Sequence, residues 1–174
     1  VAKGESDFGL CYAVDSALGR IGMLPKDEVK YDGLRAIGFL YGAPAQLVVR
    51  ADSDIKTAKD LIGKKVGVGN AGSGAAASAE RFFRHLEVWD NFNPQFLGYS
   101  AAAAAFKDGK IDAFWVLVGY PNRSIIEASV QVDIRLIDVG VEAASSKFYD
   151  AYAYIPMEIP AGTYGEGMPA CSSF

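Results

Sequence analysis

The sequence has few of the residues that common metal and catalytic sites require. Among its 174 residues His85 is the only histidine, and Cys11 and Cys171 are the only cysteines. A zinc site built on two or more histidines is therefore excluded, as are a four-cysteine zinc site and a disulfide scaffold. The composition predicts no metal site and no resident cofactor.

Positive charge and long apolar runs are scarce as well. Lys and Arg total 17 against 21 Asp and Glu, which gives a formal net charge of −4. Such a chain repels phosphate backbones, which argues against nucleic acid as a partner. No stretch reaches the ~18 to 20 consecutive apolar residues of a membrane span. Lys3 and Glu5 interrupt the start of the chain, so no signal peptide is visible.

The residues that are present indicate an α/β fold. Apolar residues make up 51% of the chain and charged residues 22%, a globular composition. Between residues 46 and 137, predicted strands alternate with predicted helices, which is typical of βαβ units around a mostly parallel sheet. The strands are predicted over 46–50, 64–68, 95–97, 111–118 and 133–137, and the helices over 57–62, 75–87, 100–107 and 123–129.

Outside this region the pattern predicts two further strands, over 7–14 and 34–40, a helix over 145–151 and an extended segment over 155–164. Ser53 or Asp54 is the expected cap of the helix over 57–62, and Ser100 is the expected cap of the helix over 100–107. Pro121 suits the first turn of the helix that follows it.

Three turns lead from strand ends, where ligands of such sheets gather. They are residues 41–44, 69–75 and 119–122. Tyr12, Tyr41 and Trp115 lie at comparable strand ends, so their rings can line a cleft, although aromatic residues at such positions are more often core. His85, near the end of its predicted helix, is interpreted as structural because positive charge is favourable there.

The glycine-rich loop before the helix over 75–87 is the most informative local feature. Gly72, Ser73 and Gly74 precede that helix. The first backbone N–H groups of a helix have no internal partner, and the helix dipole favours an anion there. Small residues let a ligand approach the backbone, and Ser73 adds a hydroxyl. The loop therefore predicts a carboxylate or a similar anion, with a plain helix cap in a tight turn as the alternative.

The same loop also matches a dinucleotide-binding pattern. Residues 67–72 read G-x-G-x-x-G, but Gly67 lies inside a predicted strand rather than at its end. A phosphate-binding P-loop is excluded, since Ala75 and Ala76 follow Gly74 in place of the Lys-Ser/Thr pair. A nucleotide-cofactor enzyme thus stays as an alternative hypothesis. Ser73 has no evident base partner, so the sequence predicts no Ser-His-Asp catalysis.

Taken in order, several segments resemble one known family. They are Leu40-Tyr41-x-x-Pro44, residues 47–53 (LVVRADS), Asp60-Leu61-x-Gly63-Lys64, Val66-x-Val68-Gly69 with Gly72-Ser73-Gly74, residues 106–114 (FKDGKIDAF), residues 134–137 (IRLI) and residues 159–164 (IPAGTY). This order resembles the solute receptors of TAXI-type TRAP transporters, over most of the chain from about Asp7 to Tyr164.

The resemblance implies a type II periplasmic-binding-protein fold with two α/β lobes, mainly parallel sheets and a cleft between the lobes. Residues 1–48 and 138–174 would form part of lobe I, and residues 49–137 would form lobe II. Such receptors are extracytoplasmic or periplasmic, bind glutamate-like amino acids or other carboxylates, and pass them to a membrane permease. We therefore expect a receptor for a small organic anion rather than an enzyme.

The predicted binding residues follow from the loop and from this resemblance. The anionic group would meet Gly72, Ser73, Gly74 and the N–H of Ala75, although the family often has Thr at the position of Ala75. The ligand's carbon body would pack on Tyr12, Tyr41 and Trp115, and the 119–122 turn would close one side. Gly119 and Pro121 of that turn, with Pro44 of the 41–44 turn, complete the predicted set.

Two further expectations concern the extent of the chain and an alternative function. Family members are usually longer at both ends, so the resemblance implies that this sequence is a central portion with an incomplete first lobe. The effector domain of a transcriptional regulator, which can share the fold, is the main alternative function.

Overall fold

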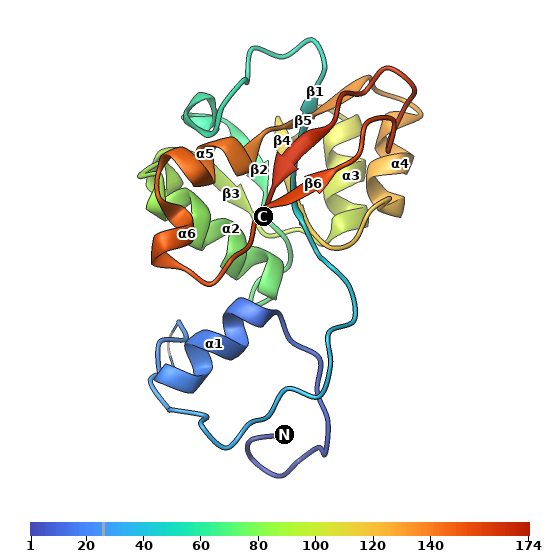
Figure 1. Ribbon diagram of the computed structural model, residues 1–174. Helices are drawn as coiled ribbons and strands as arrows, with labels where there is room; N and C mark the ends of the chain where they lie inside the picture. Colours follow the sequence, from blue (N-terminus) through green and yellow to red (C-terminus); the bar gives the residue numbers. More distant parts are fainter. Residues whose placement is uncertain (26) are drawn as a thin grey trace.

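A five-stranded mixed sheet lies at the centre of the protein (Figure 1). The computed structural model describes residues 1–25 and 27–174. The strand order is β3-β2-β4-β1-β5, with β1 (Ala45–Arg50), β2 (Lys65–Gly67), β3 (Asn93–Gln95), β4 (Ala113–Leu117) and β5 (Ile134–Ile137). β2 runs parallel to β3 and β4, whereas β1 runs antiparallel to β4 and β5. The mainly parallel α/β sheet predicted from the sequence is confirmed.

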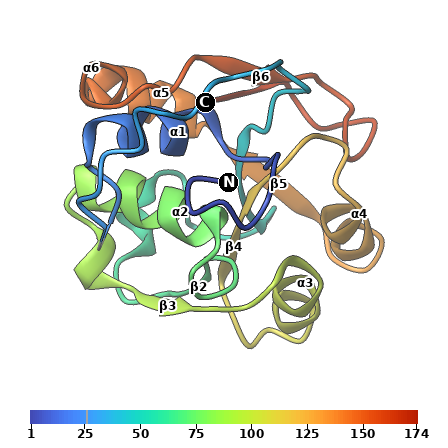
Figure 2. The ribbon, with the colours of Figure 1, turned by 90° about the horizontal axis from the view of Figure 1, so that it is seen from below.

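Helices cover both faces of this sheet (Figure 2). On one face lie α2 (Gly74–His85), α5 (Val139–Ser145) and α6 (Phe148–Ala151), and on the other lie α3 (Tyr99–Lys107) and α4 (Arg123–Ser129). Two short 3-10 helices, η1 (Ala58–Leu61) and η2 (Trp89–Asn91), and an antiparallel pair, β6 (Met157–Ile159) with β7 (Cys171–Ser173), complete this part. We call residues 45–174 the body.

Alternation along β4 divides the core into two layers. Successive side chains of a strand point to opposite faces. Trp115 therefore packs on the α2 face, while Phe114 and Val116 pack on the α3 face. Phe82 of α2 is the centre of the first layer, since its ring lies 5.7 Å from that of Trp115 and 4.9 Å from that of Phe174.

Most elements predicted between residues 46 and 137 are present. α4 spans 123–129 as predicted, because the Asn122 side chain accepts the N–H groups of Ser124 and Ile125. The predicted strand over 95–97 lies two residues earlier, in β3. Two predicted caps were wrong: the residue before η1 is Thr57, and the residue before α3 is Gly98.

The two strands predicted over 7–14 and 34–40 were wrong. Residues 34–44 and the start of the first segment are irregular, and α1 (Ala13–Ile21) takes up the end of the first segment. A strand forms when a neighbouring strand shares its backbone hydrogen bonds. Within the described residues neither segment joins a sheet, and apolar side chains such as Leu10 and Phe39 stay exposed.

The helix predicted over 145–151 is two helices. α5 begins earlier, at Val139, and ends at Ser145, and α6 begins at Phe148. Lys147 between them has a φ of 61°, a left-handed conformation that interrupts the helical path. The lobe boundary expected between residues 48 and 49 falls inside β1, and the division into lobes stays a prediction.

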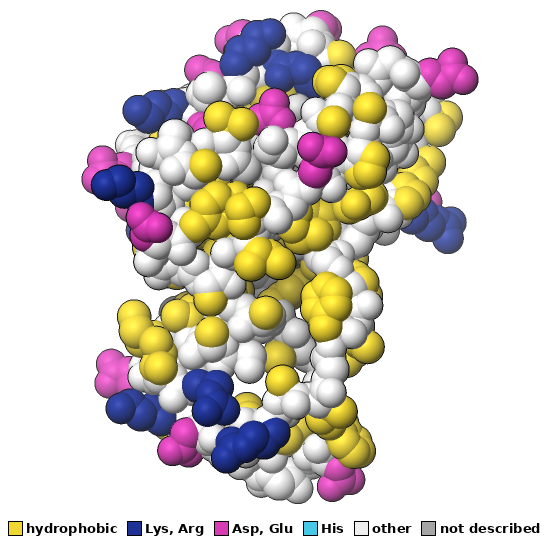
Figure 3. All heavy atoms as spheres, in the orientation of Figure 1, with side chains coloured by type: hydrophobic (Ala, Val, Ile, Leu, Met, Phe, Trp, Pro, Cys, Tyr) yellow, Lys and Arg dark blue, Asp and Glu magenta, His cyan; other side chains and the backbone are white. Residues whose placement is uncertain are grey.

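Residues 1–40, which we call the arm, lie apart from the body. α1 lies below the body in Figure 1, with its first residues next to the start of α2. Hydrophobic side chains gather at the narrow junction between arm and body (Figure 3). Across residues 1–25 and 27–174, helices with the length and apolar character needed to cross a membrane are absent.

Candidate functional site

The three turns predicted to bind a ligand meet at one edge of the sheet. β2 and β4 are parallel, so their carboxyl ends, at Gly67 and Leu117, lie on the same edge. The first residue of β1, Ala45, pairs with Leu117, which brings the turn before β1 to this edge as well. The sheet register thus places the predicted turns 41–44, 69–75 and 119–122 at the same edge.

The glycine-rich loop ends in a capped helix with unused donors. The Ser73 hydroxyl accepts the N–H of Ala76 at 3.1 Å, so it serves as the cap of α2. The N–H groups of Gly74 and Ala75 have no hydrogen-bond acceptor within the described part of the chain. The loop therefore has two backbone donors without an acceptor among the described residues, at Gly74 and Ala75, and its serine hydroxyl is used as the helix cap.

Two tyrosines converge on the carboxyl end of β4. The Tyr12 hydroxyl donates to the carbonyl oxygen of Leu117 at 2.8 Å, and the Tyr99 hydroxyl donates to the same oxygen at 3.0 Å. Burial, together with the neighbouring Tyr99, raises the pKa of Tyr12 to about 12. Burial also raises the pKa of Tyr99. Both phenols are therefore neutral near pH 7, and their single hydroxyl protons are used in the bonds to Leu117.

The predicted turn residues fall into contact positions around these tyrosines. A Cβ built on Gly74 would lie 2.4 Å from Cε2 of Tyr12, so the phenol ring lies directly against Gly74. A Cβ built on Gly119 would lie 3.4 Å from Cδ2 of Tyr41. The structure therefore brings together Tyr12, Tyr41, Gly74 and Gly119, four of the ten predicted residues.

Four other predicted residues lie differently. Trp115 has no exposed surface and packs between the sheet and Phe82, so it supports the site from the core side. Pro44 is buried beside β1, and Pro121 is exposed two positions before α4 begins, outside its first turn. Gly72 is exposed at the outer side of the loop.

Sequence reasoning missed three residues at this edge: Tyr99, Asp15 and Arg81. Tyr99 is the first residue of α3, and its hydroxyl also accepts the N–H of Leu117 at 3.2 Å. Arg81 of α2 is buried and its Nη2 lies 3.0 Å from Oδ1 of Asp15 in α1. These contacts join residues far apart in sequence, for which local spacing gives no signal.

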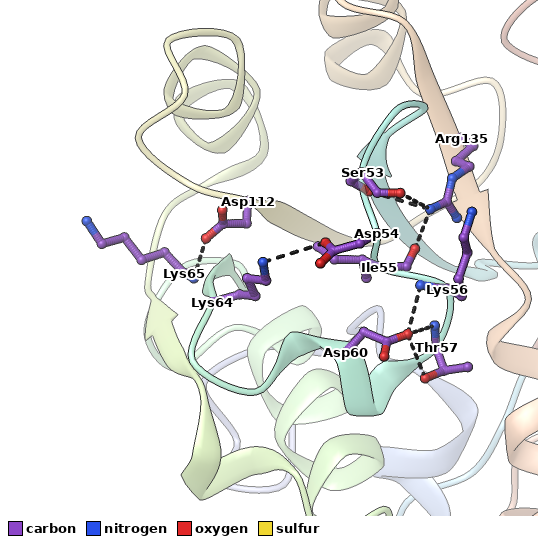
Figure 4. A network of polar contacts seen from close by, with 10 residues as sticks. All are labelled: Ser53, Asp54, Ile55, Lys56, Thr57, Asp60, Lys64, Lys65, Asp112 and Arg135. Carbon is purple, nitrogen blue, oxygen red and sulfur yellow. Dashed lines mark hydrogen bonds and ion pairs between the residues drawn. The ribbon is translucent and has the colours of Figure 1, made fainter.

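The opposite edge of the sheet has a hollow of about 480 Å³, lined by residues of both charges. Several of its polar groups are paired with protein groups, as Figure 4 shows for Lys64, Asp54 and Asp112. Lys64 forms an ion pair with Asp54 at 3.6 Å, and the Asp112 carboxylate accepts the N–H of Lys65. The Arg50 guanidinium donates to the Phe106 carbonyl at the end of α3.

A comparison with known families decides the class of the chain. The profile of the NMT1-like family matches residues 1–172, nearly the whole sequence. The chain belongs to the NMT1-like family.

Solved structures of periplasmic binding proteins are similar to part of this NMT1-like chain. The periplasmic aliphatic sulphonate binding protein SsuA from Escherichia coli matches with 22% identity and a TM-score of 0.48, over 63% of this chain and 41% of SsuA. An ancestral arginine-binding protein bound to arginine matches with 24% identity and a TM-score of 0.44, over 56% of this chain and 41% of that protein. The chain thus matches about two fifths of the length of these proteins.

Proposed function

We propose that this NMT1-like chain is part of an extracytoplasmic solute-binding receptor that captures a small organic anion. The observation that carries the proposal is the pair of unused N–H groups at Gly74 and Ala75, at the carboxyl edge of a mainly parallel sheet. Two N–H groups at the start of a twelve-residue helix favour an anionic group through hydrogen bonds and through the helix dipole.

The aromatic residues around the loop fit the carbon part of such a ligand. Tyr41 is 62% exposed and packs against Gly119, so its ring can cover a ligand next to the loop. The Tyr12 and Tyr99 hydroxyls each donate their single proton to the Leu117 carbonyl oxygen, so they fix the end of β4 beside the loop. We propose a carboxylate about the size of glutamate as the ligand. Its carboxylate would bind the two free N–H groups, and its short carbon chain would pack on the Tyr41 ring.

The resemblance to TAXI-type TRAP receptors suggests where the protein acts and what its partner is. We propose that the receptor binds its ligand outside the cytoplasm and delivers it to a membrane permease. Binding involves no covalent step, since the site consists of backbone amides, phenols and glycines rather than a nucleophile with a base.

Calorimetric titration with L-glutamate and with ethanesulfonate tests the proposal. The double variant Ser73→Ala with Gly74→Val places a branched side chain over the two N–H groups, and we expect it to bind L-glutamate at least about ten-fold more weakly. Gly165→Val is the matched control, because a Cβ at Gly165 meets no atom within 4 Å. Equal affinity of the loop variant and the control would show that the loop does not bind the anion.

A further inference from the structure

The arm is joined to the body through very few polar groups. Between residues 1–25 and 27–40 on one side and the body on the other, every hydrogen bond and ion pair involves Tyr12 or Asp15. Tyr12 bonds to Leu117, and Asp15 bonds to Arg81. Both contacts are made at the edge of the sheet where the anion is proposed to bind.

Arg81 is an unusual residue for a purely structural position. Its side chain is 6% exposed, so its charge is almost fully removed from water. Nη1 donates to the Tyr154 hydroxyl at 2.6 Å, and the guanidinium carbon lies 5.9 Å from the centre of the Tyr154 ring. The only acidic partner that the described residues offer this cation is Asp15, which comes from the arm. A buried guanidinium requires an anionic partner.

Asp15 and Tyr12 lie where the proposed ligand would lie. Oδ2 of Asp15 is 3.7 Å from the position of a Cβ on Gly74, and the Tyr12 ring is closer still. The arm therefore puts one carboxylate and one ring next to the unused N–H groups of α2. A carboxylate with a short carbon body is the chemistry proposed for the ligand itself.

We infer that the arm occupies the anion site as an internal competitor, and that Arg81 is the residue that receives the ligand's carboxylate when the arm withdraws. The inference rests on the proposed function, because it names a further binding residue and a regulation of the same site. Asp15 pairs with Arg81 in the arm-docked state, and the ligand replaces Asp15 in the bound state. Arg81 thus keeps an anionic partner in both states.

The inference assigns opposite effects to the two members of one ion pair. Apparent affinity falls in proportion to the fraction of molecules in which the site is open. Asp15→Ala removes the competing carboxylate and leaves Arg81 in place, so the affinity rises. Arg81→Met also releases the arm but removes the guanidinium that would hold the ligand, so the affinity falls. If the pair had only a structural role, both variants would change binding in the same direction.

The test is calorimetric titration of L-glutamate into the wild-type chain, Asp15→Ala and Arg81→Met. We expect about ten-fold tighter binding by Asp15→Ala and at least about ten-fold weaker binding by Arg81→Met. Asp7→Ala is the matched control, because it removes the same charge from an exposed position in the arm. Its affinity should equal that of the wild type.

A second measurement follows the arm without any ligand. Cys11 is exposed and adjoins Tyr12, whereas Cys171 is buried, so fluorescein maleimide labels the arm selectively. In both Asp15→Ala and Arg81→Met the fluorescence anisotropy of the dye should fall, because the arm is no longer held against the body, while circular dichroism shows an intact body. Unchanged anisotropy in both variants would overturn the inference, since the arm would not depend on the ion pair.

The outcomes separate this inference from the proposed function. Binding of L-glutamate by the wild type without a gain in Asp15→Ala overturns the inference alone. No binding by the wild type, Asp15→Ala or Arg81→Met overturns the proposed function, and the inference with it. Binding by Asp15→Ala where the wild type shows none supports both.

Discussion

The Tyr164 hydroxyl donates to Oε1 of Gln46, a residue 118 positions earlier in the chain. The same hydroxyl accepts the N–H of Asn122 at 2.9 Å, and Nε2 of Gln46 donates to the Val118 carbonyl at 2.9 Å. Gln46 is 1% exposed. This buried network fixes the 118–122 turn, which forms one side of the candidate site.

Tyr164→Phe should destabilise the protein and loosen this turn. The variant leaves the Gln46 oxygen and the Asn122 N–H without their partner, which costs about 1–3 kcal/mol for a buried polar group. Urea unfolding followed by tryptophan fluorescence measures the loss. Tyr120→Phe is the control, since Tyr120 is 37% exposed and its change should be close to zero. Equal midpoints for the two variants would contradict the prediction.

The starts of the helices could be predicted from the sequence, but which segments pair as strands could not. Asn122 before α4 and Ser73 before α2 are strong cap residues, and both helices begin where these residues indicate. The segments over 7–14 and 34–40 have the apolar content of strands, yet neither joins a sheet in the described residues. Apolar content shows that a segment favours burial, whereas strand formation also requires a neighbour.

In the candidate site, too, local features could be predicted and long-range contacts could not. The glycine-rich loop and its free N–H groups could be predicted, because helix starts follow local rules. The inward position of Trp115 could not, since all five residues of β4 are apolar and buried and the sequence gives no alternation to separate the faces. The Asp15–Arg81 pair joins residues 66 positions apart, and single-sequence spacing contains no information on such contacts.

Glu142 should make stability depend on pH. Its carboxylate accepts the N–H of Ala58 at 3.0 Å, but burial is the larger effect and raises the pKa of Glu142 above its ordinary value of 4.5. The folded protein therefore binds this proton more tightly than the unfolded chain does. The contribution to stability is fully present below pH 4.5 and is lost as the pH rises through the higher folded pKa.

The variant Glu142→Gln isolates this effect, because the amide keeps an acceptor oxygen for Ala58 and cannot ionise. Relative to the wild type, Glu142→Gln should gain stability between pH 4 and pH 7, measured by urea unfolding at both values. The exposed Glu158→Gln serves as the control. If the wild type instead became more stable than Glu142→Gln as the pH rose, the prediction would be contradicted.

The two cysteines should differ strongly in reactivity. Cys11 is exposed, whereas burial raises the pKa of the Cys171 thiol to about 12. The thiolate is the reactive form, so at pH 8 only about one Cys171 in ten thousand is ionised in the folded state. Ellman's reagent should therefore react with one thiol at once and with the second only after denaturation. Two rapid equivalents, or a rapid equivalent in Cys11→Ser, would contradict this.

Gly140 allows α5 to pack directly on β7. A Cβ at Gly140 would lie 2.5 Å from the nitrogen and 2.8 Å from the oxygen of Ser173, both of them backbone atoms. Gly140→Ala must therefore push α5 away from β7 and disturb the hydrogen bond from the Ser172 N–H to Asp138. We expect the free energy of unfolding to fall by about 1–3 kcal/mol, as at other overpacked sites. Where the alanine side chain fits, replacing Gly by Ala instead typically raises this free energy by about 0.4–1 kcal/mol.

Thermal and urea unfolding of Gly140→Ala measure this loss, with Gly165→Ala as the control, since a Cβ at Gly165 meets no atom within 4 Å. The control removes the same backbone freedom from the unfolded chain, so the difference between the two variants isolates the contact with β7. Because β7 ends next to Phe174, whose ring packs on Phe82, a shift of this strand should also change tryptophan emission in the folded state. Equal stability of the two alanine variants would mean that α5 and β7 are not in contact as described.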